Sequence, residues 1–206
     1  MAVFEIKDKK YKTEEDLRTV IGYVMGKCTC CFEQNLYHLG QEQLANQMLY
    51  LQHCSGKVLR TRIRHWVLSF DTKGWEWEIN KNDIMYFMQC FFQSYLNEYQ
   101  VIYGTHNDNG MEHVHILINP VNINDFHLLH WSQVEFSQVL WDMAVNLYWV
   151  LGVALQGVSY IDVRGNLKKA NMYSFLYENR YKKEIPLKDS QGRITVYPYR
   201  QGMLGA

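Results

Sequence analysis

The sequence predicts an α+β fold in which helices pack on a central antiparallel β-sheet. Three features point to this class. Short segments with alternating apolar residues interleave with longer segments of helical periodicity. Two of the strand-like segments are joined by a short polar turn, as in a hairpin. The helical segments are long enough to cover a face of the sheet, so the expected order is β-α-α-β-α-β-β-α-β-α.

The composition is that of an ordinary globular protein. The 206 residues are 48% hydrophobic and 20% charged, which fits one domain or one domain with a small appendage. The 21 basic and 21 acidic residues cancel, whereas nucleic-acid binders are usually basic. The odd count of five cysteines and the lack of a signal peptide predict a reducing cytoplasm. No apolar run is long enough to span a membrane.

The N-terminal half predicts two strands and three helices. Residues 2–7 alternate weakly and could form a first strand. A helix should begin at Thr13, whose hydroxyl can cap the first turn, and should end at Gly26. Further elements are expected as a helix over 41–54, a strand over 63–70 and a helix over 80–98. The strand over 63–70 would place His65, Val67 and Ser69 on one face.

The C-terminal half predicts a hairpin followed by a helix, a strand and a short helix. The expected elements are strands over 100–105 and 112–119, a helix over 131–151, a strand over 155–163 and a helix over 168–179. The tail from Tyr181 contains Pro186, Gly192 and Pro198, so it should be irregular. We therefore expect a main domain over 1–165, followed over 166–206 by a C-terminal helix and an irregular tail.

The hairpin contains a group of histidines that could bind a divalent metal. His113 and His115 share a strand face and lie roughly 7 Å apart along the strand. His106 ends the preceding strand, so pairing of the two strands would bring it beside them. Three neutral imidazoles would make an open site with room for substrate oxygens and water, and Asp108 could orient one of the rings. The alternative is a hairpin that merely carries surface histidines.

Two basic clusters could form a one-sided surface for phosphates. The residues of these clusters that we expect to contact phosphates are Arg60, Arg62, Arg64, Lys168 and Lys169. Such clusters are often only solvated faces, but two of them in a neutral chain allow charge to be segregated.

The histidine segment resembles the motif of HUH endonucleases, specifically the relaxases that mobilise plasmids and conjugative transposons. Their motif is a His, an acidic residue two positions later, and an H-x-H pair at seven and nine positions after the first His. His106, Asp108, His113 and His115 match these positions. A weaker similarity extends over residues 13–163. The sequence departs from the family in having Met111 and Glu112 where many relatives have Pro or His.

The resemblance implies a metal-dependent, strand-specific DNA endonuclease and transesterase with a relaxase-like palm. It would nick single-stranded DNA at an origin of transfer and leave a 5′-phosphotyrosine. Tyr23 best fits the position of the nucleophile, with Asp108 as a further catalytic residue. The implied cofactor is Mn²⁺ or Mg²⁺, although such sites also hold zinc, nickel or copper. The implied partners are origin-of-transfer DNA and accessory transfer proteins.

Three alternatives stay open at this point. Tyr23 could be a core aromatic, in which case the candidates for the nucleophile are Tyr11, Tyr37 and Tyr50. A rolling-circle replication initiator or a transposase of the same superfamily would place its tyrosine after the histidines, as Tyr173 and Tyr177 are placed. The chain could also be a catalytically silent DNA-binding module with the same fold.

Overall fold

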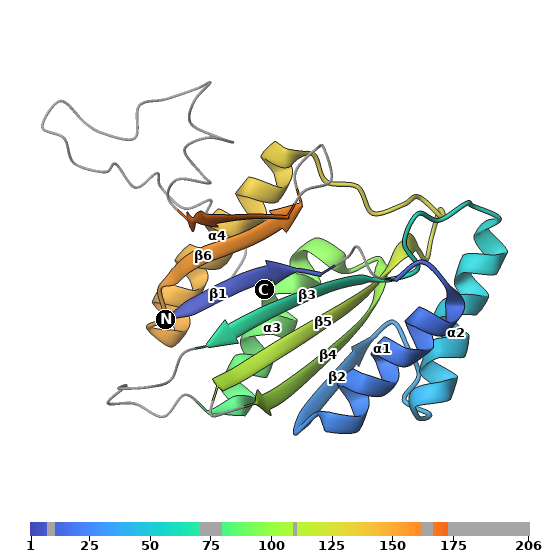
Figure 1. Cartoon of the computed structure of the whole chain (residues 1–206), viewed down its shortest axis with the longest axis horizontal. Coiled ribbons are helices and arrows are strands. Elements are labelled where there is room, and N and C mark those ends of the chain that lie inside the picture. Colours follow the sequence, from blue (N-terminus) through green and yellow to red (C-terminus); the bar gives the residue numbers. More distant parts are fainter. Residues whose placement is uncertain (8–10, 71–79, 109–110, 162–166, 173–206) are drawn as a thin grey trace, which may run out of the picture.

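A mixed β-sheet with helices on both faces forms the centre of the molecule (Figure 1). The computed structural model describes residues 1–7, 11–70, 80–108, 111–161 and 167–172. The strands are β1 (Ala2–Ile6), β2 (Cys30–Gln34), β3 (Arg64–Phe70), β4 (Tyr99–Asp108), β5 (Met111–Asn122), β6 (Leu155–Ile161) and β7 (Leu167–Asn171). The helices are α1 (Glu14–Lys27), α2 (Gln41–Ser55), α3 (Lys81–Leu96) and α4 (Gln133–Leu151).

The described strands form one sheet in the order β2-β4-β5-β3-β1-β6-β7. Neighbouring strands are antiparallel except β1 and β6, which run parallel. The α+β class predicted from the sequence is therefore confirmed, with one parallel pair in a sheet that was expected to be antiparallel. No helix in the described ranges is both long and apolar enough to cross a bilayer.

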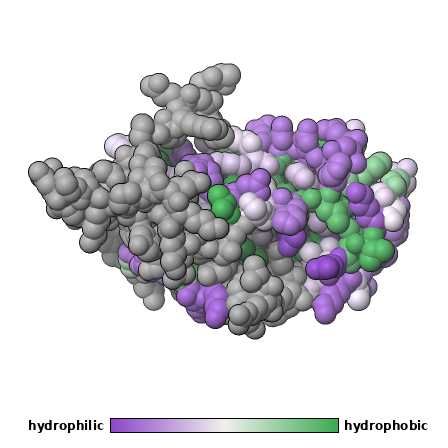
Figure 2. Space-filling model, turned by 90° about the horizontal axis from the view of Figure 1, so that it is seen from above, coloured by the Kyte–Doolittle hydropathy of each residue, from purple (hydrophilic) through white to green (hydrophobic). Residues whose placement is uncertain are grey.

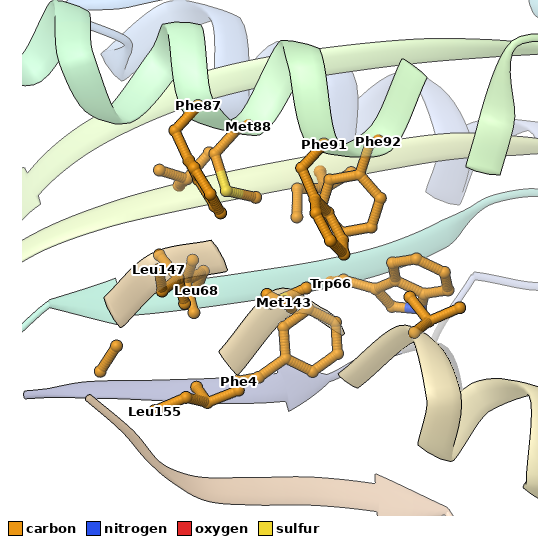
Figure 3. Close-up of a cluster of buried hydrophobic side chains, with 14 of the residues drawn as sticks. Phe4, Trp66, Leu68, Phe87, Met88, Phe91, Phe92, Met143, Leu147 and Leu155 are labelled. Atoms are coloured by element: carbon orange, nitrogen blue, oxygen red, sulfur yellow. The ribbon is translucent and has the colours of Figure 1, made fainter. Parts of the chain in front are cut away.

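Helices α3 and α4 cover one face of the sheet and enclose the larger hydrophobic core. Figure 3 shows Phe91 and Phe92 of α3 directed toward Met143 of α4, with Trp66 of β3 and Phe4 of β1 beside them. All five side chains are buried. Each fully buried side chain of this size stabilises the fold by about 1.5–3 kcal/mol, so this face holds the sheet rigid.

Helices α1 and α2 cover only part of the opposite face (Figure 1), where α1 contacts β4 and α2 contacts β5. Val20 and Val24 of α1 and Met48 of α2 pack with Ile102 of β4 and Leu117 of β5 in a second, smaller core. A capping box at Thr13 starts α1, where the sequence predicted a cap, and a left-handed Gly56 ends α2.

A glycine lets α1 lie close to the sheet. A Cβ atom added at Gly104 of β4 would be 2.7 Å from the Val24 side chain and 3.4 Å from Cβ of Cys28. Real Cβ atoms do not come this close to another carbon, so only glycine allows this approach. The C-terminal half of α1 is thereby held directly over β4.

The structure differs from the predicted elements in three places. Residues 30–34 form β2, a short edge strand that the sequence pattern did not reveal. The segment from Lys168, predicted to be a helix, begins inside strand β7, because pairing with β6 decides its conformation. Strand β4 continues to Asp108, so His106 lies within a paired strand instead of at the start of a turn. Residues 173–206 lie outside the described part, and the predicted division at residue 165 stays a prediction.

Candidate active site

The three histidines of the motif lie on the sheet face that α1 covers. His106 pairs directly with His113 across β4 and β5, and His115 pairs with Gly104. The predicted hairpin is therefore confirmed. The rings of His106 and His115 are 4.4 Å apart between centroids, and both residues are almost fully buried. Two imidazoles thus meet beneath the C-terminal half of α1.

His106 and His113 are each hydrogen-bonded to a neighbouring element. Nε2 of His106 lies 2.7 Å from the backbone carbonyl of Val24 in α1. A carbonyl only accepts, so this nitrogen carries the ring proton and donates it. Nδ1 of His113 lies 2.8 Å from the hydroxyl of Ser69 in β3. The motif is therefore tied to α1 on one side and to β3 on the other.

His115 belongs to a chain of hydrogen bonds that runs away from the motif. Its Nδ1 lies 2.8 Å from Nε2 of His65, whose Nδ1 lies 2.6 Å from the hydroxyl of Tyr11. Burial, followed by the neighbouring histidines, lowers the pKa of His115 from 6.5 to about 3. His115 is therefore neutral at physiological pH, which is the state in which an imidazole ligates a metal.

The donor set fits a divalent cation, although the side chains do not form a finished site. No group of three or more His, Cys, Asp or Glu side chains within the described ranges is placed to hold a metal ion. However, Nδ1 of His106 is buried without a hydrogen-bond partner. Because Nε2 of this ring carries the proton, Nδ1 offers a lone pair in the cluster. An orphaned lone pair of this kind calls for a bound group.

Tyr23 of α1 lies against the two buried imidazoles. Its ring centroid is 5.3 Å from that of His106 and 5.7 Å from that of His115, both edge-on. The side chain is nevertheless 41% exposed, so a substrate could reach it. The ammonium of Lys27 lies 4.9 Å from the centre of the Tyr23 ring. This corner thus brings together a phenol, a cation and two imidazoles.

A comparison with known protein families identifies the family of this chain. Residues 23–141, more than half of the chain, match the family described as relaxase, MobA/VirD2-like, nuclease domain. The chain belongs to this relaxase family. The matched segment begins at Tyr23 and includes all three motif histidines. No curated protein matched the sequence.

Solved structures show the same fold at low sequence identity. A structure described under "Molecular Basis of Vancomycin Resistance Transfer in Staphylococcus aureus" has a TM-score of 0.53 and 9% identity, covering 74% of this chain and 97% of its own. A manganese-bound MobM relaxase domain in complex with plasmid pMV158 oriT DNA has a TM-score of 0.52 and 13% identity, covering 75% and 88%. These likenesses support the relaxase fold.

The other tyrosines considered for the relaxase are placed differently. Tyr37 and Tyr50 are 80% and 72% exposed, and Tyr50 is hydrogen-bonded to Cys54 along α2. Tyr11 is bonded to His65 and so lies behind the motif histidines. Tyr173 and Tyr177 lie outside the described residues, as does the side chain of Asp108, so their predicted roles stay predictions.

The basic residues of the relaxase are spread around the sheet. Arg64 pairs with Ile118 at the end of β3 away from His113, and its guanidinium contacts the carbonyl of Leu129. Arg62 bonds Gln52 and lies 3.8 Å from a carboxylate oxygen of Glu14. Arg60 is exposed in the loop before β3. Arg64 therefore lies roughly 17 Å along the strand from the position of His113 and roughly 10 Å from that of His115.

The two lysines of β7 point to opposite faces. Across the sheet, Lys169 pairs with Ser159, and Ser159 pairs with Glu5. Glu5 in turn pairs with Val67, and Val67 pairs with His115. Paired residues share a face, so Lys169 lies on the face of the histidines. Lys168, as its neighbour in the strand, lies on the other face.

The sequence did not reveal the part that His65 plays. Its position on one face with Ser69 was visible from the alternation, but its contact with His115 depends on the pairing of β3 with β5. That pairing joins segments about 50 residues apart, which local patterns cannot predict.

Proposed function

We propose that this relaxase nicks single-stranded DNA at an origin of transfer through attack by Tyr23. The observation that carries the proposal is the position of Tyr23, exposed on one side and in ring contact with His106 and His115 on the other. A scissile phosphate bound there would meet the phenol and the imidazole cluster together.

The reaction exchanges one phosphodiester bond for another. Oη of Tyr23 bonds to phosphorus, the bond to the 3′ oxygen breaks, and the released 3′ oxygen takes up a proton to replace the one that the phenol loses. The products are a 5′-phosphotyrosine and a free 3′-OH. Lys27, over the Tyr23 ring, would offset negative charge on the entering phosphate.

His106, His113 and His115 would hold the divalent cation, Mn²⁺ or Mg²⁺. When bound, the cation neutralises charge on the phosphate oxygens in the transition state. The unpartnered Nδ1 of His106 and the neutral state of His115 support this assignment. Asp108 would assist at the end of β4. The MobM relaxase domain with the same fold is described as manganese-bound.

Single-stranded origin-of-transfer DNA would be the partner, and the MobM relaxase domains are described as bound to oriT DNA. Phosphates would be contacted by Lys169 on the histidine face and by Arg60, Arg62 and Arg64, with a smaller contribution from Lys168 on the opposite face. Accessory transfer proteins would join this complex. The DNA substrate and the five unpaired cysteines fit a reducing compartment, so we place the activity in the cytoplasm.

Adduct formation tests the proposal. The wild-type chain incubated with a pool of single-stranded oligonucleotides and Mn²⁺ should give a peptide–DNA adduct that mass spectrometry maps to Tyr23. Tyr23→Phe removes only the attacking oxygen, so it should give no adduct while keeping its fold, and a chelator should stop the wild-type reaction. Tyr50→Phe, which alters an exposed tyrosine of α2, is the control and should react normally.

An adduct that persists in Tyr23→Phe would contradict the proposal. Its mapping to Tyr173 or Tyr177 would favour a replication initiator or a transposase. DNA binding without any adduct in the wild-type chain would favour the silent binding module.

A further inference from the structure

A fourth histidine outside the motif is buried against His115. His65 of β3 is 3% exposed and His115 is 6% exposed. Nε2 of His65 lies 2.8 Å from Nδ1 of His115, and the two ring centroids are 5.1 Å apart. On its other side, Nδ1 of His65 lies 2.6 Å from the hydroxyl of Tyr11. Both ring nitrogens of His65 are therefore used within the protein.

The outer end of this chain is fixed by the backbone. The carbonyl of Tyr11 accepts hydrogen bonds from the amide of Arg62 at 2.7 Å and from the hydroxyl of Thr61 at 3.0 Å. The segment that carries Tyr11 is thus bound to the residues that lead into β3. Tyr11, His65 and His115 thus form one hydrogen-bonded chain that connects the segment before α1 with strands β3 and β5.

The hydrogen bonds decide which nitrogen of His115 faces the candidate metal site. Nδ1 of His115 is occupied by His65, so only Nε2 remains for a cation. An imidazole that ligates through Nε2 carries its proton on Nδ1. That proton is then donated to Nε2 of His65, and His65 in turn carries its own proton on Nδ1 and donates it to the Tyr11 oxygen.

We propose that His65, anchored by Tyr11, is a positioning residue that keeps the proton of His115 on Nδ1 and directs its Nε2 toward the cation. This inference rests on the metal site of the proposed function. In many metal sites a carboxylate or a backbone carbonyl accepts a hydrogen bond from the second ring nitrogen of the ligating histidine. Here the imidazole of His65 would accept that hydrogen bond. Since the acceptor is neutral, it fixes the ring without adding charge to the cation site.

Manganese affinity, measured by calorimetry on the full chain, tests the proposal. His65→Phe keeps a ring but removes the acceptor, so Mn²⁺ should bind 10–100-fold more weakly. His65→Gln places an amide oxygen near the position of Nε2 and should recover most of the affinity. Tyr11→Phe removes only the outer hydroxyl and should cause a smaller loss. Tyr95→Phe is the control, because it removes the tyrosine hydrogen bond to Asp142 on the opposite face.

The proton position in the metal-free protein gives a second readout. Nitrogen-15 NMR should find the proton of His115 on Nδ1 in the wild type and divided between both nitrogens in His65→Phe. Failure of the wild type to bind Mn²⁺ would contradict the metal site itself, while the NMR result would still decide the role of His65. Wild-type Mn²⁺ affinity and an unchanged His115 tautomer in His65→Phe and Tyr11→Phe would overturn the proposal. If His65→Phe does not fold, the Mn²⁺ affinity and the His115 tautomer of Tyr11→Phe test the proposal instead.

Discussion

Burial keeps His115 uncharged, and the fold depends on that state. The imidazole is nearly inaccessible to water and has other histidines around it, so its pKa in the folded protein falls to about 3 from 6.5. In the unfolded chain the same residue takes up a proton near its ordinary pKa of about 6.5. The unfolded state therefore binds more protons than the folded state throughout this window.

Stability should consequently fall as the pH is lowered below about 6.5. The contribution of His115 is complete above that pH and is lost progressively as the pH approaches 3, by up to about 1.4 kcal/mol per pH unit. His115→Gln removes the titrating group, so its free energy of unfolding should vary less between pH 7 and 5. Urea unfolding of the metal-free protein measures this, with the exposed His38→Gln as control. Equal pH dependence in wild type and His115→Gln would show that the folded imidazole takes up its proton normally.

At the scale of elements, the position of α1 over β4 connects packing with chemistry. Val24 both fills the space above Gly104 and offers its carbonyl to His106. Tyr23 is the preceding residue of the same helix. A displacement of α1 would therefore move the phenol and release the His106 ring at once.

Gly104→Ala tests this coupling. The added methyl group would be 2.7 Å from the Val24 side chain, so α1 must shift. We expect a loss of about 1–3 kcal/mol in the free energy of unfolding and a lower yield of the Tyr23 adduct. Gly157→Ala is a matched control in β6, since its nearest neighbour would be at an ordinary 3.6 Å. Full adduct yield in Gly104→Ala would show that the position of α1 is not critical.

The sequence predicted where helices and strands form better than it predicted which strands pair with each other. Helices with a cap and a strong apolar stripe, such as α1, were found within a few residues, because their signals are local. The edge strands β2 and β7 were missed, because partners far along the chain define them. The motif histidines were found through fixed spacing in one hairpin, whereas the role of His65 required knowledge of the sheet order.

At the scale of the whole molecule, the two faces of the sheet are unequally covered. Helices α3 and α4 enclose one face, while on the other face no helix of the described residues lies in front of β1, β6 and β7 (Figure 1). Figure 2 shows hydrophilic residues over much of the described surface visible from above, with hydrophobic residues between them. The open part of the histidine face is where we expect single-stranded DNA to lie.

Separate substitutions of Lys168 and Lys169 can show which face of the sheet binds DNA. Lys169 shares the histidine face, so Lys169→Gln should weaken oligonucleotide binding and reduce the slope of log affinity against log salt by about 0.7. Lys168→Gln removes the same charge from the opposite face and should have a smaller effect. Fluorescence anisotropy between 50 and 200 mM salt is the measurement. A larger effect of Lys168→Gln would place the DNA on the other face.

The central place of β1 has a consequence for how the chain reaches its native state. Strand β1 precedes the other described strands in the sequence, and it pairs with β3 on one side and with β6 on the other, through Ala2 and Leu155. The edge that faces β6 stays open until β6 has been synthesised. Strands β1 and β6 lie far apart along the chain, and contacts between such distant segments form slowly. Refolding should therefore take milliseconds to seconds instead of microseconds. A nascent chain that stops after α4 would carry an unpaired strand edge, which is a site for aggregation.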